Sequence, residues 1–108
     1  MSLPADPVRA FVLILEIDLH FPGSTNLKAK RSELAPVKAH LHNRLGATVA
    51  EVAHQDRWQR ATLVAALVGG SARRLHSAAD GLEGWLDARL PAGARVERRL
   101  ASVQDIWG

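Results

Sequence analysis

Cysteine is absent from this sequence of 108 residues. Its absence excludes disulfide bonds, thiolate zinc sites and cysteine nucleophiles, and leaves His, Asp and Glu as the available metal ligands. Long apolar runs are absent as well. The longest, residues 11–19, is interrupted by Glu16 and Asp18 and is far shorter than the roughly 20 apolar residues of a membrane-spanning helix. Since no signal-peptide pattern opens the chain either, we expect a cytoplasmic protein.

Internal repeats, low-complexity tracts and linkers are also missing, and the length suits one domain with a single core. We expect residues 10–108 to form this domain and residues 1–9, with two prolines, to form a flexible N-terminal arm. The net charge of +3 and the sequence pI of about 10.2 make polyanions the first partner class to consider. Acidic residues are interspersed, so the basic excess is modest.

Hydrophobic periodicity predicts four strands and two helices. The predicted strands cover residues 11–20, 48–54, 59–68 and 95–103. Apolar residues at helical spacing predict one helix that ends at Gly46 and a second that ends at Pro91. Because Pro36 is costly inside a helix, we expect Ser32 to cap the first helix and residues 27–31 to form only an introductory turn.

The order of these elements predicts the fold. Strand, helix, strand, strand, helix, strand is the split βαβ or ferredoxin-like arrangement, an α+β fold. Right-handed crossovers then give a four-stranded antiparallel sheet of order 4-1-3-2 with both helices on one face. This topology brings three segments that are remote in sequence to one end of the sheet, which we call the rim. The segments are residues 20–31, 54–60 and 91–95.

Polar, basic and aromatic side chains gather in two of the rim segments. The candidate binding residues are His20, Ser24, Lys28, Lys30, Arg31, His54, Asp56, Arg57, Trp58 and Arg60. Chain reversal does not require such a collection, so we expect these side chains to serve another purpose. Cations can contact phosphates, and an exposed Trp can stack on a nucleic-acid base. Alternatively, Trp58 covers the open end of the core, and Asp56 pairs with an arginine or caps the turn.

Two motifs in the same segments resemble a known family. Residues 19–31 contain Leu-His-x-Pro-Gly-Ser and then Leu-Lys-x-Lys-Arg, and residues 49–61 contain Val-Ala-Glu-Val-x-His-Gln-Asp-x-Trp-Gln-Arg-Ala. With these motifs the chain resembles the YlxP-like family of small bacterial proteins, although Asn26 and Pro36 depart from the family pattern. The resemblance implies a ferredoxin-like fold and no established catalytic role. Members of that family often lie beside translation and ribosome-maturation genes, so the resemblance also implies an RNA or ribosome connection.

The start of the first helix is also a candidate anion site. Ser24, Thr25 and Asn26 precede a helix entry that carries Lys28, Lys30 and Arg31, so free backbone N–H groups and cations could hold a phosphate there. The alternative is that the polar residues cap the helix while the cations point into water.

Metal binding and hydrolysis are weaker interpretations. His20 and His54 with nearby carboxylates could bind a metal, but no tight ligand spacing is present. Ser24 or Ser32 with His20 and Asp56 has the residue types of a hydrolytic triad without the glycine spacing of a nucleophile elbow. We therefore expect no metal, cofactor or catalytic residue.

The sequence favours a non-enzymatic module that binds structured RNA or a ribosomal particle through the basic, Trp-containing rim. A small-anion or phosphate-ester enzyme or sensor at the same rim is the second hypothesis. The third is a homodimeric interaction module, because Val12, Ile14 and Val64 would leave an apolar sheet face exposed.

Overall fold

The computed structural model describes residues 8–107, so that residues 1–7 of the predicted arm lie outside the described range. The elements are β1 Phe11–His20, α1 Leu27–Leu45, β2 Thr48–Ala53, β3 Arg60–Gly69, α2 Ala72–Arg89, β4 Ala94–Ser102 and α3 Val103–Trp107. All predicted strands are present with small shifts of their ends, and both predicted helices are present. The short helix α3 was not predicted.

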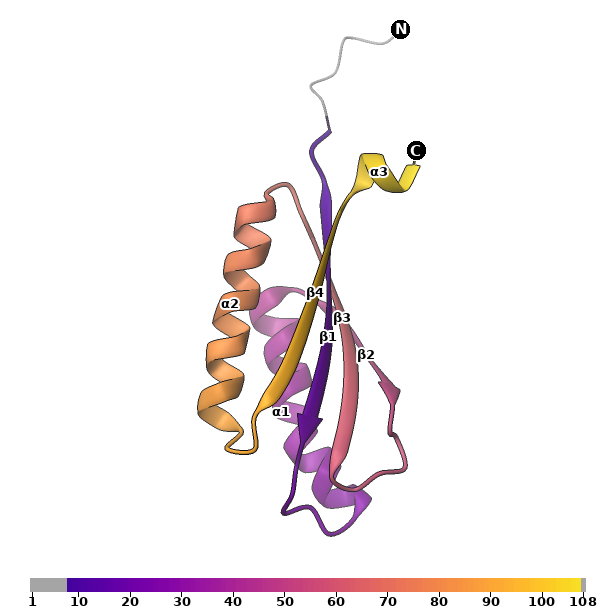
Figure 1. Ribbon diagram of the computed structural model, residues 1–108, viewed down its shortest axis with the longest axis vertical. Helices are drawn as coiled ribbons and strands as arrows, with labels where there is room; N and C mark the ends of the chain where they lie inside the picture. The colour runs from indigo at the N-terminus through magenta and orange to yellow at the C-terminus, as the bar shows by residue number, and fades with distance from the viewer. Residues whose placement is uncertain (1–7, 108) are drawn as a thin grey trace, which may run out of the picture.

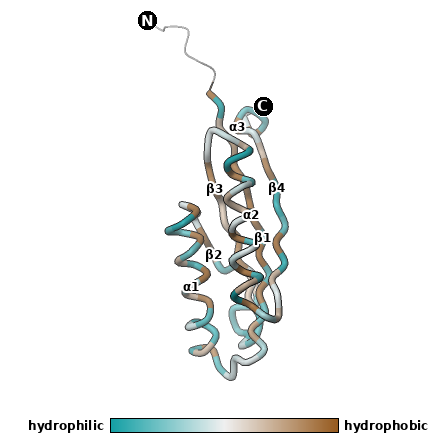
Figure 2. Tube along the Cα trace, turned by 90° about the vertical axis from the view of Figure 1, so that its left-hand side faces the viewer, coloured by the Kyte–Doolittle hydropathy of each residue, from teal (hydrophilic) through white to brown (hydrophobic). Residues whose placement is uncertain are grey.

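The four strands form one antiparallel sheet of order β2-β3-β1-β4, which is the predicted order read from the other edge. Figure 1 shows α1 and α2 on the same side of this sheet, and the turned view in Figure 2 shows them next to each other. The ferredoxin-like fold is therefore confirmed. The opposite side of the sheet, which we call the open face, is covered by neither long helix.

Strand β1 shows why the sheet has one buried face. Leu13, Leu15 and Ile17 are fully buried against the helices, whereas the alternating residues Ile14 and Glu16 are exposed on the open face. Side chains of α1 and α2 at helical spacing complete the same core. Apolar side chains that recur every second residue in the strands therefore pack against apolar side chains that recur every 3.6 residues in the helices, and together they form one core.

Helix α1 begins at Leu27, so the prediction that Ser32 caps it was wrong. Asn26 is the cap, and its side-chain oxygen accepts the backbone N–H of Ala29 at 2.8 Å. Pro36 lies inside the helix and removes one intrahelical hydrogen bond. Burial of Lys30 and other side chains on both sides of Pro36 keeps the helix continuous, because both halves pack on the same sheet.

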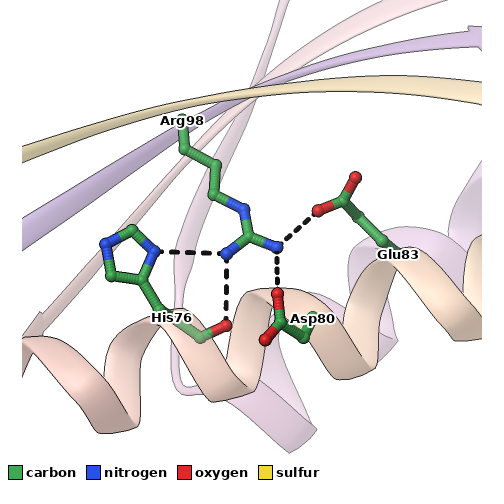
Figure 3. A network of polar contacts seen from close by, with 4 residues as sticks. All are labelled: His76, Asp80, Glu83 and Arg98. Carbon is green, nitrogen blue, oxygen red and sulfur yellow. Dashed lines mark hydrogen bonds and ion pairs between the residues drawn. The ribbon is translucent and has the colours of Figure 1, made fainter.

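Arg98 connects the edge strand β4 to α2. Its guanidinium group donates to the carboxylates of Asp80 and Glu83 and to the backbone carbonyl of His76, as Figure 3 shows. The imidazole Nδ1 of His76 lies 3.2 Å from the same guanidinium group. One arginine therefore bridges two turns of the helix and holds α2 against the charged edge of the sheet.

Among the helices of residues 8–107, none combines the length and apolar composition needed to cross a bilayer.

Candidate functional site

The three rim segments meet at one end of the sheet, as the topology predicted. His20 and Arg60 lie opposite each other at the ends of β1 and β3. Just beyond them, the Phe21 N–H donates to the Gln59 carbonyl at 2.9 Å, and the Gln59 side chain donates to the Ser24 carbonyl at 3.3 Å. These bonds join the β1–α1 loop to the β2–β3 loop at the lower end of the molecule in Figure 1.

Lys30 of α1 holds the β2–β3 loop in place through hydrogen bonds to its backbone. Its side chain is 2% exposed, and its ammonium group donates to the carbonyl of His54 at 2.7 Å and lies 3.0 Å from the carboxylate of Glu51. His54 has a positive φ of 64°, which is unfavourable for a residue with a side chain. Its carbonyl also accepts the N–H of Arg57 at 3.0 Å. The buried ammonium group therefore stabilises a strained turn.

An open depression of about 570 Å³ occupies this end of the molecule. It is lined by His20, His54, Asp56, Arg57, Trp58, Gln59 and Arg60. Trp58 is 53% exposed, so about half of its surface is available to a ligand. The exposed indole lies between two exposed arginines in sequence. A flat aromatic surface and two cations are thus available to one ligand.

A second depression of about 490 Å³ adjoins the first, because His20 lines both. It includes Glu33, Arg89 and Pro91, which confirms that the α2–β4 loop belongs to the same end of the molecule. His20 therefore lies at the boundary between two depressions, which together extend across the rim.

The remaining predicted residues do not line the first depression. The Ser24 hydroxyl is buried and makes no hydrogen bond among the described residues, and the Lys30 ammonium group is occupied by Glu51 and His54. Lys28 and Arg31 are exposed on the first turns of α1. With Asn26 acting as the cap, the start of α1 offers a phosphate fewer groups than the sequence suggested.

A basic surface along α1 was missed at the sequence level. Lys28, Arg31, Lys38 and His42 are exposed and are spaced so that they lie on one side of the helix. Lys38 and His42 line a depression of about 370 Å³ with Thr48 at the start of β2, which places this side of α1 next to the sheet edge. Helical spacing of the cations could have revealed the stripe, which spans about 21 Å.

Metal ligands do not gather in residues 8–107: no group of three or more His, Asp and Glu side chains there is arranged to hold a metal ion. His20 and His54 do share the depression with Asp56, but as part of its lining.

These observations define the chain as a ferredoxin-like α+β protein with a polar, Trp-containing rim. Residues 12–99 match the family described as "Protein of unknown function (DUF503)", and the chain belongs to this family. No curated protein matches the chain significantly.

Two solved structures are similar in fold. The de novo designed protein Foldit4 aligns with a TM-score of 0.54 and 9% identity over 85% of this chain and 96% of its own. A dimeric ferredoxin-like protein from an uncultured marine organism aligns with a TM-score of 0.44 and 13% identity over 85% of this chain and 87% of its own. At such low identity, the likeness to the designed protein concerns the fold alone.

Proposed function

We propose that this chain is a YlxP-like, cytoplasmic, non-enzymatic module that binds structured RNA, in particular ribosomal RNA, at the rim. The observation that carries the proposal is the half-exposed Trp58 beside the exposed Arg57 and Arg60 in an open depression. The motifs in residues 19–31 and 49–61 support the YlxP-like assignment within the DUF503 family.

The chemistry of the depression suits an unpaired nucleotide within a structured RNA. An indole can stack on any base, and stacking of this kind contributes about 1–3 kcal/mol per base. Arg57 and Arg60 can contact the flanking phosphates, and the imidazoles of His20 and His54 can donate to or accept from base edges and ribose hydroxyls. A bulge or loop that presents one splayed base would use all of these groups at once.

The charge of α1 supports the same ligand. Of its exposed ionised residues, Lys28, Arg31, Lys38 and Arg44 are cations and only Glu33 is an anion. Since Lys30 ties α1 to the Trp58-bearing loop, the cationic side of α1 continues from the rim. An RNA that stacks on Trp58 would therefore find phosphate-binding cations along the adjacent helix.

Partner capture tests this proposal. Intact protein should retain ribosomal RNA or ribosomal particles from a lysate, and nuclease should release them. The Trp58→Ala/Arg60→Ala variant should lose the capture, whereas Arg73→Ala/Arg74→Ala, which removes two exposed arginines at the far end of α2, should keep it. Capture that resists nuclease, or that survives loss of Trp58 and Arg60, would exclude RNA binding at the rim.

We also propose self-association through the open face, because a cluster of apolar side chains on this face, mainly at the end away from the rim, is not covered by the chain's own helices. Val12, Ile14, Val64 and Val68 lie on this face in adjacent rows of β1 and β3, with Ile14 41% and Val68 71% exposed. Contiguous exposed apolar side chains of this kind mark interaction surfaces. The molecular mass in sedimentation equilibrium should rise from monomer to dimer with concentration. Ile14→Lys should prevent this, and Ala39→Lys on the outer side of α1 should not.

A further inference from the structure

We propose that α3 is a dimer clasp: in a two-fold dimer, Ile106 and Trp107 of each copy pack on the open face of the other, and Asp105 pairs with Arg99 of the second copy. The inference rests on the self-association proposed above and identifies the segment that completes it.

Helix α3 displays apolar side chains that its own chain leaves uncovered. Trp107 is 82% exposed and Ile106 is 60% exposed, and no residue of α3 is buried. The helix is nevertheless held in place at its start. The N–H of Val103 donates to the carbonyl of Ala10 at 2.9 Å, and the N–H of Gln104 donates to the Ser102 hydroxyl at 3.2 Å. An anchored helix with a large exposed indole is suited to contact another molecule.

The position of α3 directs it toward the open face. In Figure 1, α3 projects from the end of β4 on the side of the sheet opposite α2, and Figure 2 places it behind the sheet when the helices face the viewer. Because β4 ends beside the first residues of β1, this is the end of the sheet at which the open face is apolar. Val12 pairs with Val68 of β3 and with Ala101 of β4 in this row.

A second copy of this chain fits both features at once. Each copy has a projecting apolar helix and an uncovered apolar surface, so a two-fold axis lets every copy cover the other in the same way. An axis near Val12, with the β1 strands running in opposite directions, places α3 of each copy over the row of Ile14 and Arg99 of the other. A single arrangement then covers both groups of exposed side chains.

Charge complementarity favours this arrangement. Arg99 is exposed on the open face opposite Ile14, and Asp105 is exposed on α3. Neither side chain forms an ion pair within residues 8–107, although other charges of β4 do. In the two-fold dimer the carboxylate and the guanidinium group of different copies meet twice.

The same geometry keeps the rim free. The rim lies at the end of β1 opposite α3, so two copies that overlap near Val12 carry their rims at the two far ends of the assembly (Figure 1). Glu16, Asp18 and Arg95, which make the rim half of the open face charged, remain in water. Dimerisation and ligand binding at the rim are therefore compatible.

Charge reversal tests the clasp. The dimer dissociation constant should rise roughly tenfold or more for Trp107→Ala, the size of effect expected for an interfacial aromatic anchor. Asp105→Arg and Arg99→Glu should each weaken the dimer, and the Asp105→Arg/Arg99→Glu double variant should regain affinity because the ion pair is restored in reverse. Arg73→Glu, an equal charge reversal on α2, should change nothing. All these positions are exposed, and circular dichroism checks that each variant is folded.

The outcomes separate the two proposals. A chain that remains monomeric at every concentration overturns both the self-association and the clasp. If Ile14→Lys abolishes the dimer but Trp107→Ala and both charge reversals leave its dissociation constant unchanged, the self-association is supported and the clasp is overturned. Weakening by both single charge reversals without recovery in the double variant overturns the Asp105 and Arg99 pairing.

Discussion

The ammonium group of Lys30 lies 2.7 Å from the carbonyl oxygen of His54, and this contact joins α1 to the loop that carries Trp58. The same ammonium group lies 3.0 Å from the carboxylate of Glu51. One lysine of α1 therefore binds both a carboxylate of β2 and a backbone carbonyl of the turn that follows β2. The shape of the rim therefore depends on a buried side chain that no ligand can reach.

Replacement of Lys30 should destabilise the protein. In Lys30→Met the partly buried carboxylate of Glu51 loses its counter-ion and the His54 carbonyl loses a donor, so we expect a loss of about 3 kcal/mol in the free energy of unfolding. Urea denaturation measures this loss. Lys28→Met, two residues earlier and exposed, should change stability by less than about 0.5 kcal/mol. Equal stability of the two variants would contradict the structural role of Lys30.

Substitution of Pro36 should stabilise α1. Because Pro36 lies within the helix, Pro36→Ala restores an N–H donor to the carbonyl of Ser32 and removes a poor helix former. We expect a gain of about 1–3 kcal/mol, visible as a higher midpoint of thermal unfolding. If Pro36→Ala is neutral or destabilising, Pro36 must supply packing or restriction of the unfolded chain that offsets its cost in the helix.

The stability of the protein should fall in mild acid partly because of His40. Its ring stacks on Trp85 of α2, with centroids 4.0 Å apart, and burial together with the nearby Arg44 lowers the pKa of His40 below 6.5. The unfolded state then binds the proton more readily, so the contribution of His40 is complete above pH 6.5 and decreases as the pH falls below that value.

Comparison of stability curves tests this effect. Between pH 8 and pH 5, wild type should lose more stability than His40→Gln, whose side chain does not titrate. Parallel curves would show that His40 has the same pKa in both states. A proton NMR titration of the His40 ring reports the pKa directly.

Binding of RNA to the rim should depend steeply on salt. Each phosphate contact contributes roughly 0.7–0.9 to the slope of log K against log salt concentration, so Lys28→Ala/Arg31→Ala should reduce the slope by about 1.5. Fluorescence anisotropy with labelled ribosomal RNA fragments measures it. Trp58→Ala should lower the affinity at every salt concentration and leave the slope unchanged, because stacking releases no counter-ions. An unaltered slope in the double variant would remove Lys28 and Arg31 from the interface.

Much of the fold could be predicted because it depends on local periodicity. Strand β1 alternates almost without exception, and the order of strands and helices leaves few topologies with right-handed crossovers. The start of α1 could not be predicted from the same rules, because Pro36 argued for a late start. Lys30 lies in this early part of α1, and its contact with the β2–β3 loop joins residues that are 24 positions apart.

The candidate site was predictable in place and less so in detail. Topology located His20, His54, Trp58 and Arg60 at one end, and the structure puts all four around one depression. The topology could not show that Lys30 turns inward, because most lysines are exposed. Lys30 is buried because the partly buried carboxylate of Glu51 and the carbonyl of His54 bind its ammonium group.

The sequence by itself determined the four strands, the two long helices and the order in which they are connected, because the spacing of apolar residues and turn formers acts over a few positions. Only the tertiary structure decided which cations are free to bind and which side chains are left uncovered. Lys30 of α1 forms an ion pair with Glu51 of β2 and is not free to bind a ligand. Trp58 and Trp107 are exposed at opposite ends of the sheet. Burial and ion pairing depend on distant parts of the chain meeting, which no local pattern records.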